Sequence, residues 1–119
     1  MRVFLVPGLE ECIELYPWAE WIEFENKLAA QPQFNPAVRK IQRAFVSAAQ
    51  DVEVDKLGRI LIPAQLRTRA KLGREVLWAG MTKRIELWDR ERFEAAANRD
   101  LATPEAQEEL QKALSELGM

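Results

Sequence analysis

The chain has no histidine, a single cysteine and no long apolar run. Without histidine it offers neither a Ser-His-Asp nor a Cys-His catalytic arrangement, and no typical zinc site. The one cysteine, Cys12, cannot form an internal disulfide. No stretch approaches the roughly 18 apolar residues that a membrane span needs, and the N-terminus is not typical of a signal peptide. The sequence therefore predicts a non-enzymatic, cytoplasmic protein with no cofactor, no metal, no membrane partner and no small-molecule substrate.

Positive charge is concentrated in one segment, although acidic residues outnumber basic ones by 19 to 17 over the 119-residue chain. Between residues 56 and 74 no acidic residue occurs, and the basic residues are Lys56, Arg59, Arg67, Arg69, Lys71 and Arg74. The remainder of the chain carries eleven basic residues against nineteen acidic ones. A basic segment on an acidic background can hold a phosphate backbone locally without binding polyanions over the whole surface. We therefore expect DNA or RNA as the partner.

The order of strand and helix patterns predicts an α+β fold. Period-two runs bounded by glycine or proline predict strands, and apolar residues near the 3.6-residue period predict helices, several with a capping residue or a proline at their start. Strands are predicted at 2–6, 12–16, 52–54, 60–62, 75–79 and 84–88. Helices are predicted from Pro17 to before Pro32, from Asn35 to Ala48, from Pro63 to Leu72, from Asp89 to Arg99, and from Thr103 to Leu117.

The two hairpin–helix units read as an internal repeat with an insertion-free offset of 72 residues. Leu5, Gly8, Ile13, Glu14 and Leu15 of the first unit reappear as Leu77, Gly80, Ile85, Glu86 and Leu87. By this offset, the counterpart of residues 55–59 would lie before Met1, so the first repeat is expected to lack its front half. Two unrelated units that share an amphipathic pattern are the alternative. The four tryptophans, Trp18, Trp21, Trp78 and Trp88, fall within these units and are expected to pack in the core.

The sequence DKLGR, residues 55–59, has the residues of a tight turn that presents an arginine. The Asp55 side chain can accept hydrogen bonds from backbone N–H groups two or more residues ahead, and Gly58 can adopt a positive φ at little steric cost. Arg59 would then be held in place, and its planar guanidinium can grip a phosphate or make two hydrogen bonds to a guanine. Taken alone, D-x-x-G-R also fits an ordinary surface turn.

These residues carry a resemblance to a known family. VDKLGRILIPAQLR, followed by LG, resembles the DNA-binding half of the AbrB-type swapped-hairpin fold, and the surrounding repeat resembles the MraZ family of bacterial regulators over roughly residues 1–100. The resemblance implies a two-repeat swapped-hairpin small β-barrel with flanking helices. It further implies that Arg59 is the principal DNA contact, with Lys56 and Arg67 as further DNA-binding residues and Asp55 and Gly58 shaping the loop.

Two departures from the family pattern matter. Val52 and Glu53 precede the turn where AbrB-type loops often carry basic residues, which weakens the case for a second row of phosphate contacts. The expected loss of half a repeat would also leave one D-x-x-G-R loop instead of two.

Three segments are expected. They are residues 1–34, an incomplete first repeat, residues 35–100, a linking helix and a complete second repeat, and residues 101–119, a helical tail. The resemblance implies a nucleoid-associated transcriptional regulator, such as a repressor, that binds double-stranded DNA. As a homo-oligomer, in a ring, it would contact repeated promoter elements of the division and cell-wall gene cluster. One alternative is an antitoxin-like or adaptor protein whose tail binds a partner, and another is an assembly subunit without DNA binding.

Overall fold

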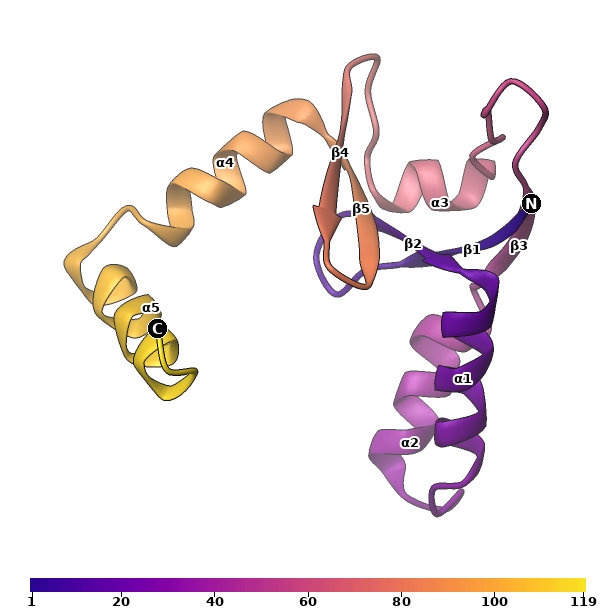
Figure 1. The fold of residues 1–119 in the computed structure, drawn as a ribbon, viewed down its shortest axis with the longest axis horizontal. Coiled ribbons are helices and arrows are strands. Elements are labelled where there is room, and N and C mark those ends of the chain that lie inside the picture. The colour runs from indigo at the N-terminus through magenta and orange to yellow at the C-terminus, as the bar shows by residue number, and fades with distance from the viewer. The chain divides into compact units, whose positions relative to one another are not determined.

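All the predicted helices and five of the six predicted strands are present in the computed structural model, which describes residues 1–119 (Figure 1). The chain forms two compact units, Met1–Asp89 and Arg90–Met119. In the first unit the elements are β1 Arg2–Pro7, β2 Ile13–Pro17, α1 Trp18–Ala29, α2 Pro36–Ile41, the π-helix η1 Gln42–Val46, β3 Gln50–Glu53, α3 Ala64–Arg69, β4 Val76–Met81 and β5 Arg84–Asp89. The second unit contains α4 Arg90–Asp100 and α5 Pro104–Glu116.

The strands form one antiparallel sheet in the order β3-β1-β2-β5-β4. This arrangement confirms the α+β class. The sheet is open, with β3 and β4 at its two edges, whereas the family resemblance implies a small β-barrel. The strand predicted at Ile60–Ile62 is also wrong, because this segment pairs with no other strand although Ile60 and Ile62 pack against the core. A barrel cannot close while β4 lacks a neighbour on its outer side.

An approximate two-fold symmetry relates the two hairpins about an axis at the centre of the sheet. In the β2–β5 pair, Glu14 faces Glu86, and Ile13 and Leu15 face Leu87 and Ile85. Residues separated by 72 positions therefore exchange places about the Glu14–Glu86 pair. The offset of 72 thus holds for β2 and β5.

The same offset is wrong for the first strand of each hairpin. Leu5 faces Leu15, whereas the residue that faces Leu87 is Trp78, not Leu77. The offset between β1 and β4 is consequently 73. The cause is the first hairpin turn, which has one more residue than the second, so an alignment without insertions misses the shift.

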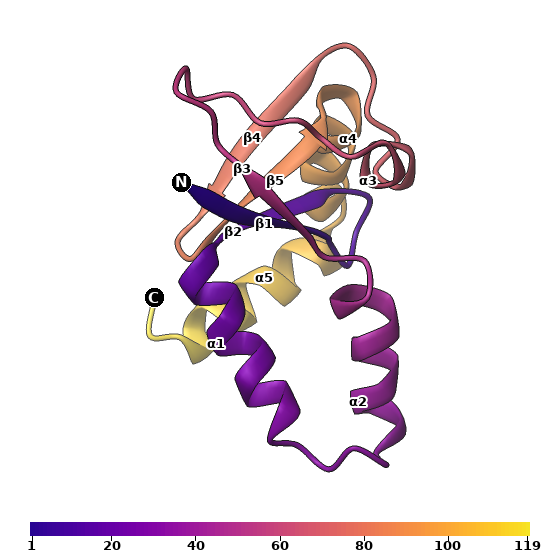
Figure 2. The ribbon, with the colours of Figure 1, turned by 90° about the vertical axis from the view of Figure 1, so that its right-hand side faces the viewer.

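Different helices cover the two faces of the sheet (Figure 2). On one face, Leu66 of α3 and Ala70, which follows this helix, join a buried cluster with Leu5, Ile13 and Leu87. On the other face, the rings of Phe4 and Tyr16 lie 6.0 and 5.3 Å from the ring of Trp21 in α1. The sheet is therefore the middle layer of this unit. The D-x-x-G-R segment follows the end of β3 and lies on the side of the sheet that α3 covers.

Helix ends follow the predicted caps in most places. The backbone N–H of Ala37 donates to Asn35 Oδ1 at 2.9 Å, and that of Ala106 donates to Thr103 Oγ1 at 3.1 Å. The helix that starts at Pro36 continues as the π-helix η1, and α3 ends at Arg69 instead of Leu72. Lys71 adopts a left-handed φ of 55° there, a position at which glycine is the usual residue. No helix of this chain is both long enough and apolar enough to cross a membrane.

Candidate DNA-binding turn

The DKLGR turn is closed by hydrogen bonds within five residues. Asp55 N–H donates to the Arg59 carbonyl at 2.9 Å, and Gly58 N–H donates to the Asp55 carbonyl at 3.0 Å. The Asp55 carboxylate oxygen Oδ1 accepts from the N–H groups of Leu57 and Arg59 at 2.9 and 2.8 Å. Gly58 has a φ of 78°, which a side chain would disfavour. The structure thus places Asp55 and Gly58, the predicted loop-shaping residues, within one hydrogen-bonded turn.

Arg59 is held at its base and exposed at its tip. Its Nε donates to Asp55 Oδ2 at 2.9 Å, and 72% of its side chain is exposed. This contact leaves the two terminal Nη groups for a ligand. A guanidinium fixed through Nε loses less conformational entropy when it binds than a freely rotating side chain would.

The Asp55 carboxylate is held in its charged form. The hydrogen bond from the Arg59 backbone N–H lowers the pKa of Asp55 below its usual 3.8, and the bonds from the Arg59 side chain and the Leu57 N–H act in the same direction. A charged carboxylate is the better acceptor for all three donors. The turn therefore keeps its geometry throughout the neutral pH range.

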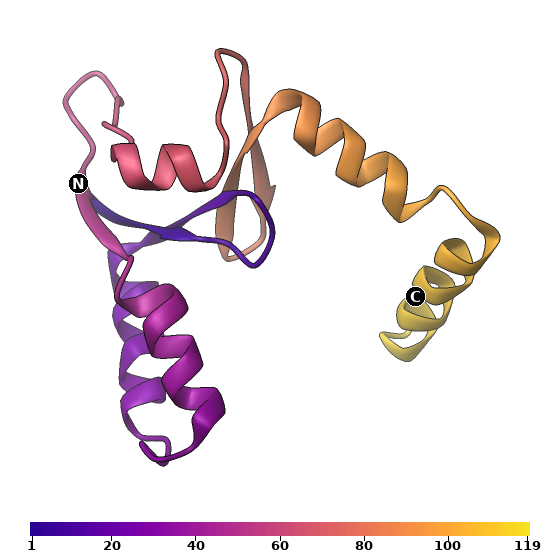
Figure 3. The ribbon, with the colours of Figure 1, turned by 180° about the vertical axis from the view of Figure 1, so that it is seen from behind.

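Lys56 and Arg67, the other predicted contacts, are exposed. Lys56 lies inside the turn, next to Asp55. Arg67 lies in α3, and it lines a groove of about 410 Å³ that Arg59 also lines. The turn leaves the sheet beyond β3 and returns toward α3 (Figure 3). The three predicted DNA contacts thus belong to one continuous segment from residue 56 to residue 67.

The remaining basic residues of the segment differ in their surroundings. Lys71 Nζ lies 2.9 Å from Glu11 Oε1, and Arg69 Nη1 donates to the Ala44 carbonyl at 3.4 Å. Arg74 is exposed and forms no ion pair. Arg59 and Lys71 each pair with one carboxylate, so the unpaired positive charge of the segment lies on Lys56, Arg67, Arg69 and Arg74.

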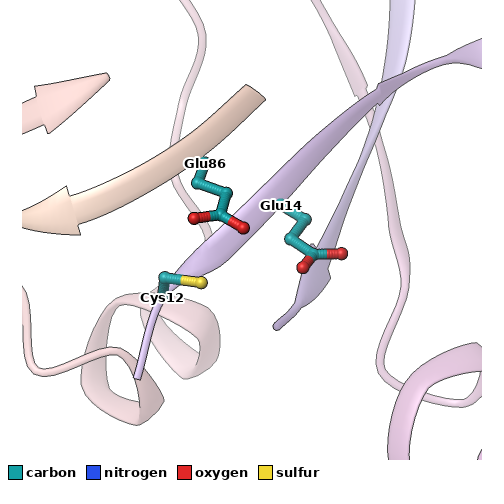
Figure 4. A group of neighbouring side chains, drawn as sticks. All are labelled: Cys12, Glu14 and Glu86. Carbon is teal, nitrogen blue, oxygen red and sulfur yellow. The ribbon is translucent and has the colours of Figure 1, made fainter. Parts of the chain in front are cut away.

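A second polar cluster, which sequence reasoning did not identify, lies at the centre of the sheet (Figure 4). The ligating atoms of Cys12, Glu14 and Glu86 lie within 4.8 Å of one another. Arg84 forms ion pairs with both carboxylates: its Nη2 lies 3.0 Å from Glu86 Oε2, and its Nε lies 3.4 Å from Glu14 Oε2. The repeat did mark Glu14 and Glu86 as equivalent, but it gave no sign that they face each other.

This cluster is suited to holding the sheet together, not to binding a metal. Burial, together with the charges of Glu86 and Glu14, raises the pKa of Cys12 to about 12, so the thiol stays protonated. Tyr16 donates to Glu14 at 2.7 Å, and Trp88 Nε1 donates to Glu86 at 2.9 Å. A cation would have to displace Arg84 and compete with both aromatic donors.

The comparisons with known proteins agree on one family. Residues 45–114, more than half of the chain, match the family described as "MraZ protein, putative antitoxin-like". The chain is 40% identical over 109 residues to the transcriptional regulator MraZ of Marinomonas sp. (strain MWYL1), covering 92% of this chain and 72% of that protein. It is 37% identical over 118 residues to that of Thermoanaerobacter pseudethanolicus, covering 99% of this chain and 80% of the relative.

A third relative, from Heliobacterium modesticaldum, is 46% identical over 86 residues, which is 72% of this chain and 60% of the relative. All three relatives are named as transcriptional regulators, so the chain belongs to a class of non-enzymatic regulators of transcription. Within that class, the sequence identities and the coverage of both chains identify the family. The chain belongs to the MraZ family.

Proposed function

We propose that this protein regulates transcription by binding double-stranded DNA through the DKLGR turn, with Arg59 as the principal contact and Lys56 and Arg67 beside it. The observation that carries the proposal is the geometry of Arg59, whose guanidinium is fixed to Asp55 through Nε and is 72% exposed. A planar group presented in this way can make two hydrogen bonds to a guanine edge or clasp a phosphate.

The finer parts of the proposal concern assembly and target. One arginine contributes about 1–3 kcal/mol of discrimination, which is far too little to select one promoter in a genome. An oligomer that binds repeated promoter elements would gain affinity because the later contacts become intramolecular. We therefore propose that the chain acts as a homo-oligomer, as in a ring, on repeated elements of the division and cell-wall gene cluster, in the cytoplasm at the nucleoid.

The decisive experiment compares Arg59→Ala with Arg43→Ala on a DNA duplex selected from a random library by the parent protein. Arg43 is exposed, forms no ion pair and lies in η1, outside the basic segment. We expect Arg59→Ala to weaken binding by about 10-fold or more and Arg43→Ala to change it by less than about two-fold. Circular dichroism should show both variants folded. Equal binding by Arg59→Ala and the parent would overturn the assignment.

Two further variants separate base contacts from phosphate contacts. Arg59→Lys keeps the charge but loses the planar fork, so it should lose sequence preference more than total affinity. Lys56→Ala should weaken binding to all sequences alike and reduce the slope of log affinity against log salt by about one.

A second candidate function is that of an antitoxin-like or adaptor protein. It is favoured by the description of the matching family and by the apolar stripe of α5, in which Leu110 and Leu114 are 42% and 45% exposed. An amphipathic helix with an exposed apolar face can bind in a groove of a partner protein. Deletion of residues 101–119 should then abolish co-purification of a specific toxin-like protein while leaving DNA binding intact. Loss of DNA binding on the same deletion would instead place the helix in the regulator's own machinery.

A further inference from the structure

The apex of the DKLGR turn carries an apolar side chain that the core does not use. Leu57 is 76% exposed and lies next to Lys56, two residues before Arg59. From the segment that follows, the core cluster takes Ile60 and Ile62. A leucine exposed in this way gives up the hydrophobic stabilisation that burial supplies. Leu57 therefore contributes little to the stability of the folded chain.

The turn itself does not call for a leucine either. Residues 55–58 are closed by the hydrogen bond from the Gly58 N–H to the Asp55 carbonyl. Turns of this kind favour aspartate at the first position and glycine at the fourth, and they accept most residues in between. An exposed position at the apex of a turn is usually polar. The leucine thus stands out for its chemistry as well as for its exposure.

Exposure alone does not distinguish Leu57, because other large apolar side chains are partly exposed. Trp18 and Trp78 are 42% and 46% exposed, so the prediction that all tryptophans pack in the core is wrong for these two. The Trp18 ring nevertheless has a partner, since it lies 6.4 Å from the ring of Phe4. What distinguishes Leu57 is its position among the predicted DNA contacts, between Lys56 and Arg59.

The backbone that carries Leu57 is fixed by hydrogen bonds. The Leu57 N–H donates to Asp55 Oδ1 at 2.9 Å, and the next N–H, that of Gly58, donates to the Asp55 carbonyl at 3.0 Å. A fixed backbone restricts the directions in which a side chain can project. Since Asp55 also holds Arg59 through Nε, the side chains of Leu57 and Arg59 project from one preorganised turn (Figure 3).

The spacing of these two residues matches that of neighbouring base pairs. Consecutive Cα atoms lie about 3.8 Å apart, so those of Leu57 and Arg59 are separated by at most about 7.6 Å. Base pairs are stacked about 3.4 Å apart, so this separation spans about two steps of the duplex. In the major groove a guanine presents the acceptors O6 and N7, whereas a thymine presents its C5-methyl group. An arginine and an apolar side chain suit these two bases.

We propose that Leu57 is a specificity-determining residue, whose side chain packs against the methyl group of a thymine within about two base pairs of the guanine that Arg59 contacts. This inference rests on the proposed function, because it requires the turn to enter the major groove. The contact removes apolar surface of both the leucine and the methyl group from water. The turn then reads two base pairs, while Lys56 holds the phosphate backbone.

The test uses the duplex that the parent protein selects from a random library, with each thymine near the guanine replaced in turn by deoxyuridine. Deoxyuridine pairs as thymine does and lacks only the methyl group. We expect one replacement to weaken binding of the full chain by about four-fold, the effect of leaving one methyl group in water. Leu57→Ala should bind the thymine and deoxyuridine duplexes equally, and Leu57→Met, which remains apolar, should keep the preference for thymine.

Leu9→Ala is the matched control. Leu9 is 89% exposed and follows the end of β1, whereas the turn follows β3 at the opposite end of β1, where Glu53 pairs with Arg2. This variant loses the same apolar surface at a site away from the turn. It should therefore show the same four-fold preference as the parent, to within about two-fold.

The preference for thymine separates a base contact from a structural role. If Leu57 only supported the turn, Leu57→Ala would weaken binding to both duplexes alike and keep the preference, which would overturn the inference. A selected duplex without a thymine at this distance would also overturn it, as would a parent protein insensitive to every replacement. Insensitivity is the result for a leucine inserted from the minor groove, because the methyl group lies in the major groove.

The proposed function fails by a different result. Equal binding by Arg59→Ala and the parent would overturn the turn as the DNA contact, and this inference with it. Weak binding by Arg59→Ala, together with an unchanged thymine preference in Leu57→Ala, would overturn the role of Leu57 alone.

Discussion

Glu14 and Glu86 face each other directly across the central β2–β5 pair, and each accepts a hydrogen bond from the aromatic side chain two residues further along its own strand. Opposed like charges destabilise a strand pair. Here Arg84 lies against both carboxylates. Burial alone would lower the pKa of Arg84, but its hydrogen bond to Glu86 and the charge of Glu14 raise it instead. The guanidinium is therefore a permanent counter-ion at the symmetry centre.

Removal of this counter-ion should destabilise the fold. We expect Arg84→Met to lower the free energy of unfolding by about 1–3 kcal/mol at pH 7, less than for a fully buried pair because Arg84 retains some solvent contact. Urea unfolding at pH 7 measures the effect. Lys83→Met, an exposed neighbour, is the control, and an equal loss in both variants would refute the role of Arg84.

Gly58 should be required for its backbone conformation and not for lack of space. A Cβ at Gly58 would meet no atom within 4 Å, but the φ of 78° disfavours any side chain. We expect Gly58→Ala to destabilise the native conformation of the turn by about 1–2 kcal/mol. DNA binding should weaken as a result, because Arg59 would be held in place less often. Gly80→Ala, where a Cβ also meets nothing and φ is not positive, should leave binding unchanged. The comparison requires binding isotherms for both variants on the same duplex.

Asp55 provides a test that separates turn geometry from charge. Asp55→Asn removes a negative charge near the proposed DNA contact, which by Coulomb attraction alone would strengthen binding. We expect weaker binding instead, because the amide is a poorer acceptor for the Leu57 and Arg59 N–H groups and releases the Arg59 side chain. Tighter binding by the variant would show that Asp55 does not position Arg59.

The pH dependence of the turn follows from the lowered pKa of Asp55. Because the folded pKa lies below the unfolded value, the charged carboxylate stabilises the turn above about the ordinary value of 3.8, and this contribution is lost as the pH falls through the folded pKa. The amide resonances of Leu57 and Arg59 should therefore titrate with a midpoint below pH 3.8. Movement of these resonances near pH 5 would contradict the assignment.

Cys12 should be inert while the protein is folded. Its pKa of about 12 leaves almost no thiolate at pH 8, and the side chain is 4% exposed. We expect its reaction with a disulfide reagent at pH 8 to be slower than that of the unfolded chain by about 100-fold or more, the rate being limited by opening of the fold. Rapid reaction of the native protein would show that the fold opens locally around the start of β2.

The same thiol fixes the first hairpin turn by close packing. A Cβ at Gly8 would lie 2.5 Å from Cys12 Sγ, so Gly8→Ala should cost about 1–3 kcal/mol. Most of that cost should disappear in a Cys12→Ala background, because the sulfur that causes the clash is absent. A double-mutant cycle of unfolding free energies measures this coupling.

The sequence was sufficient for the helices, for five of the six predicted strands and for the turn, because their signals are local. Periodicity and caps such as Asn35 and Thr103 mark the helices, and Asp55 and Gly58 mark the turn. It was insufficient for relationships across strands. One additional residue between β1 and β2 shifts the alignment of the repeats, and no local pattern shows that Arg84 lies between two carboxylates. The open edge of β4 likewise depends on which strands find neighbours.

The hydrogen bonds that shape the DKLGR turn all run between residues 55 and 59, so the presentation of the guanidinium does not depend on the layers beneath it. Substitutions in the sheet can raise or lower stability without redirecting Arg59, and substitutions around the turn can alter the proposed DNA contact without loosening the sheet. Selection can therefore act on the stability of the fold and on the proposed contact independently. The turn is, for the same reason, a suitable unit to transplant when binding specificity is redesigned.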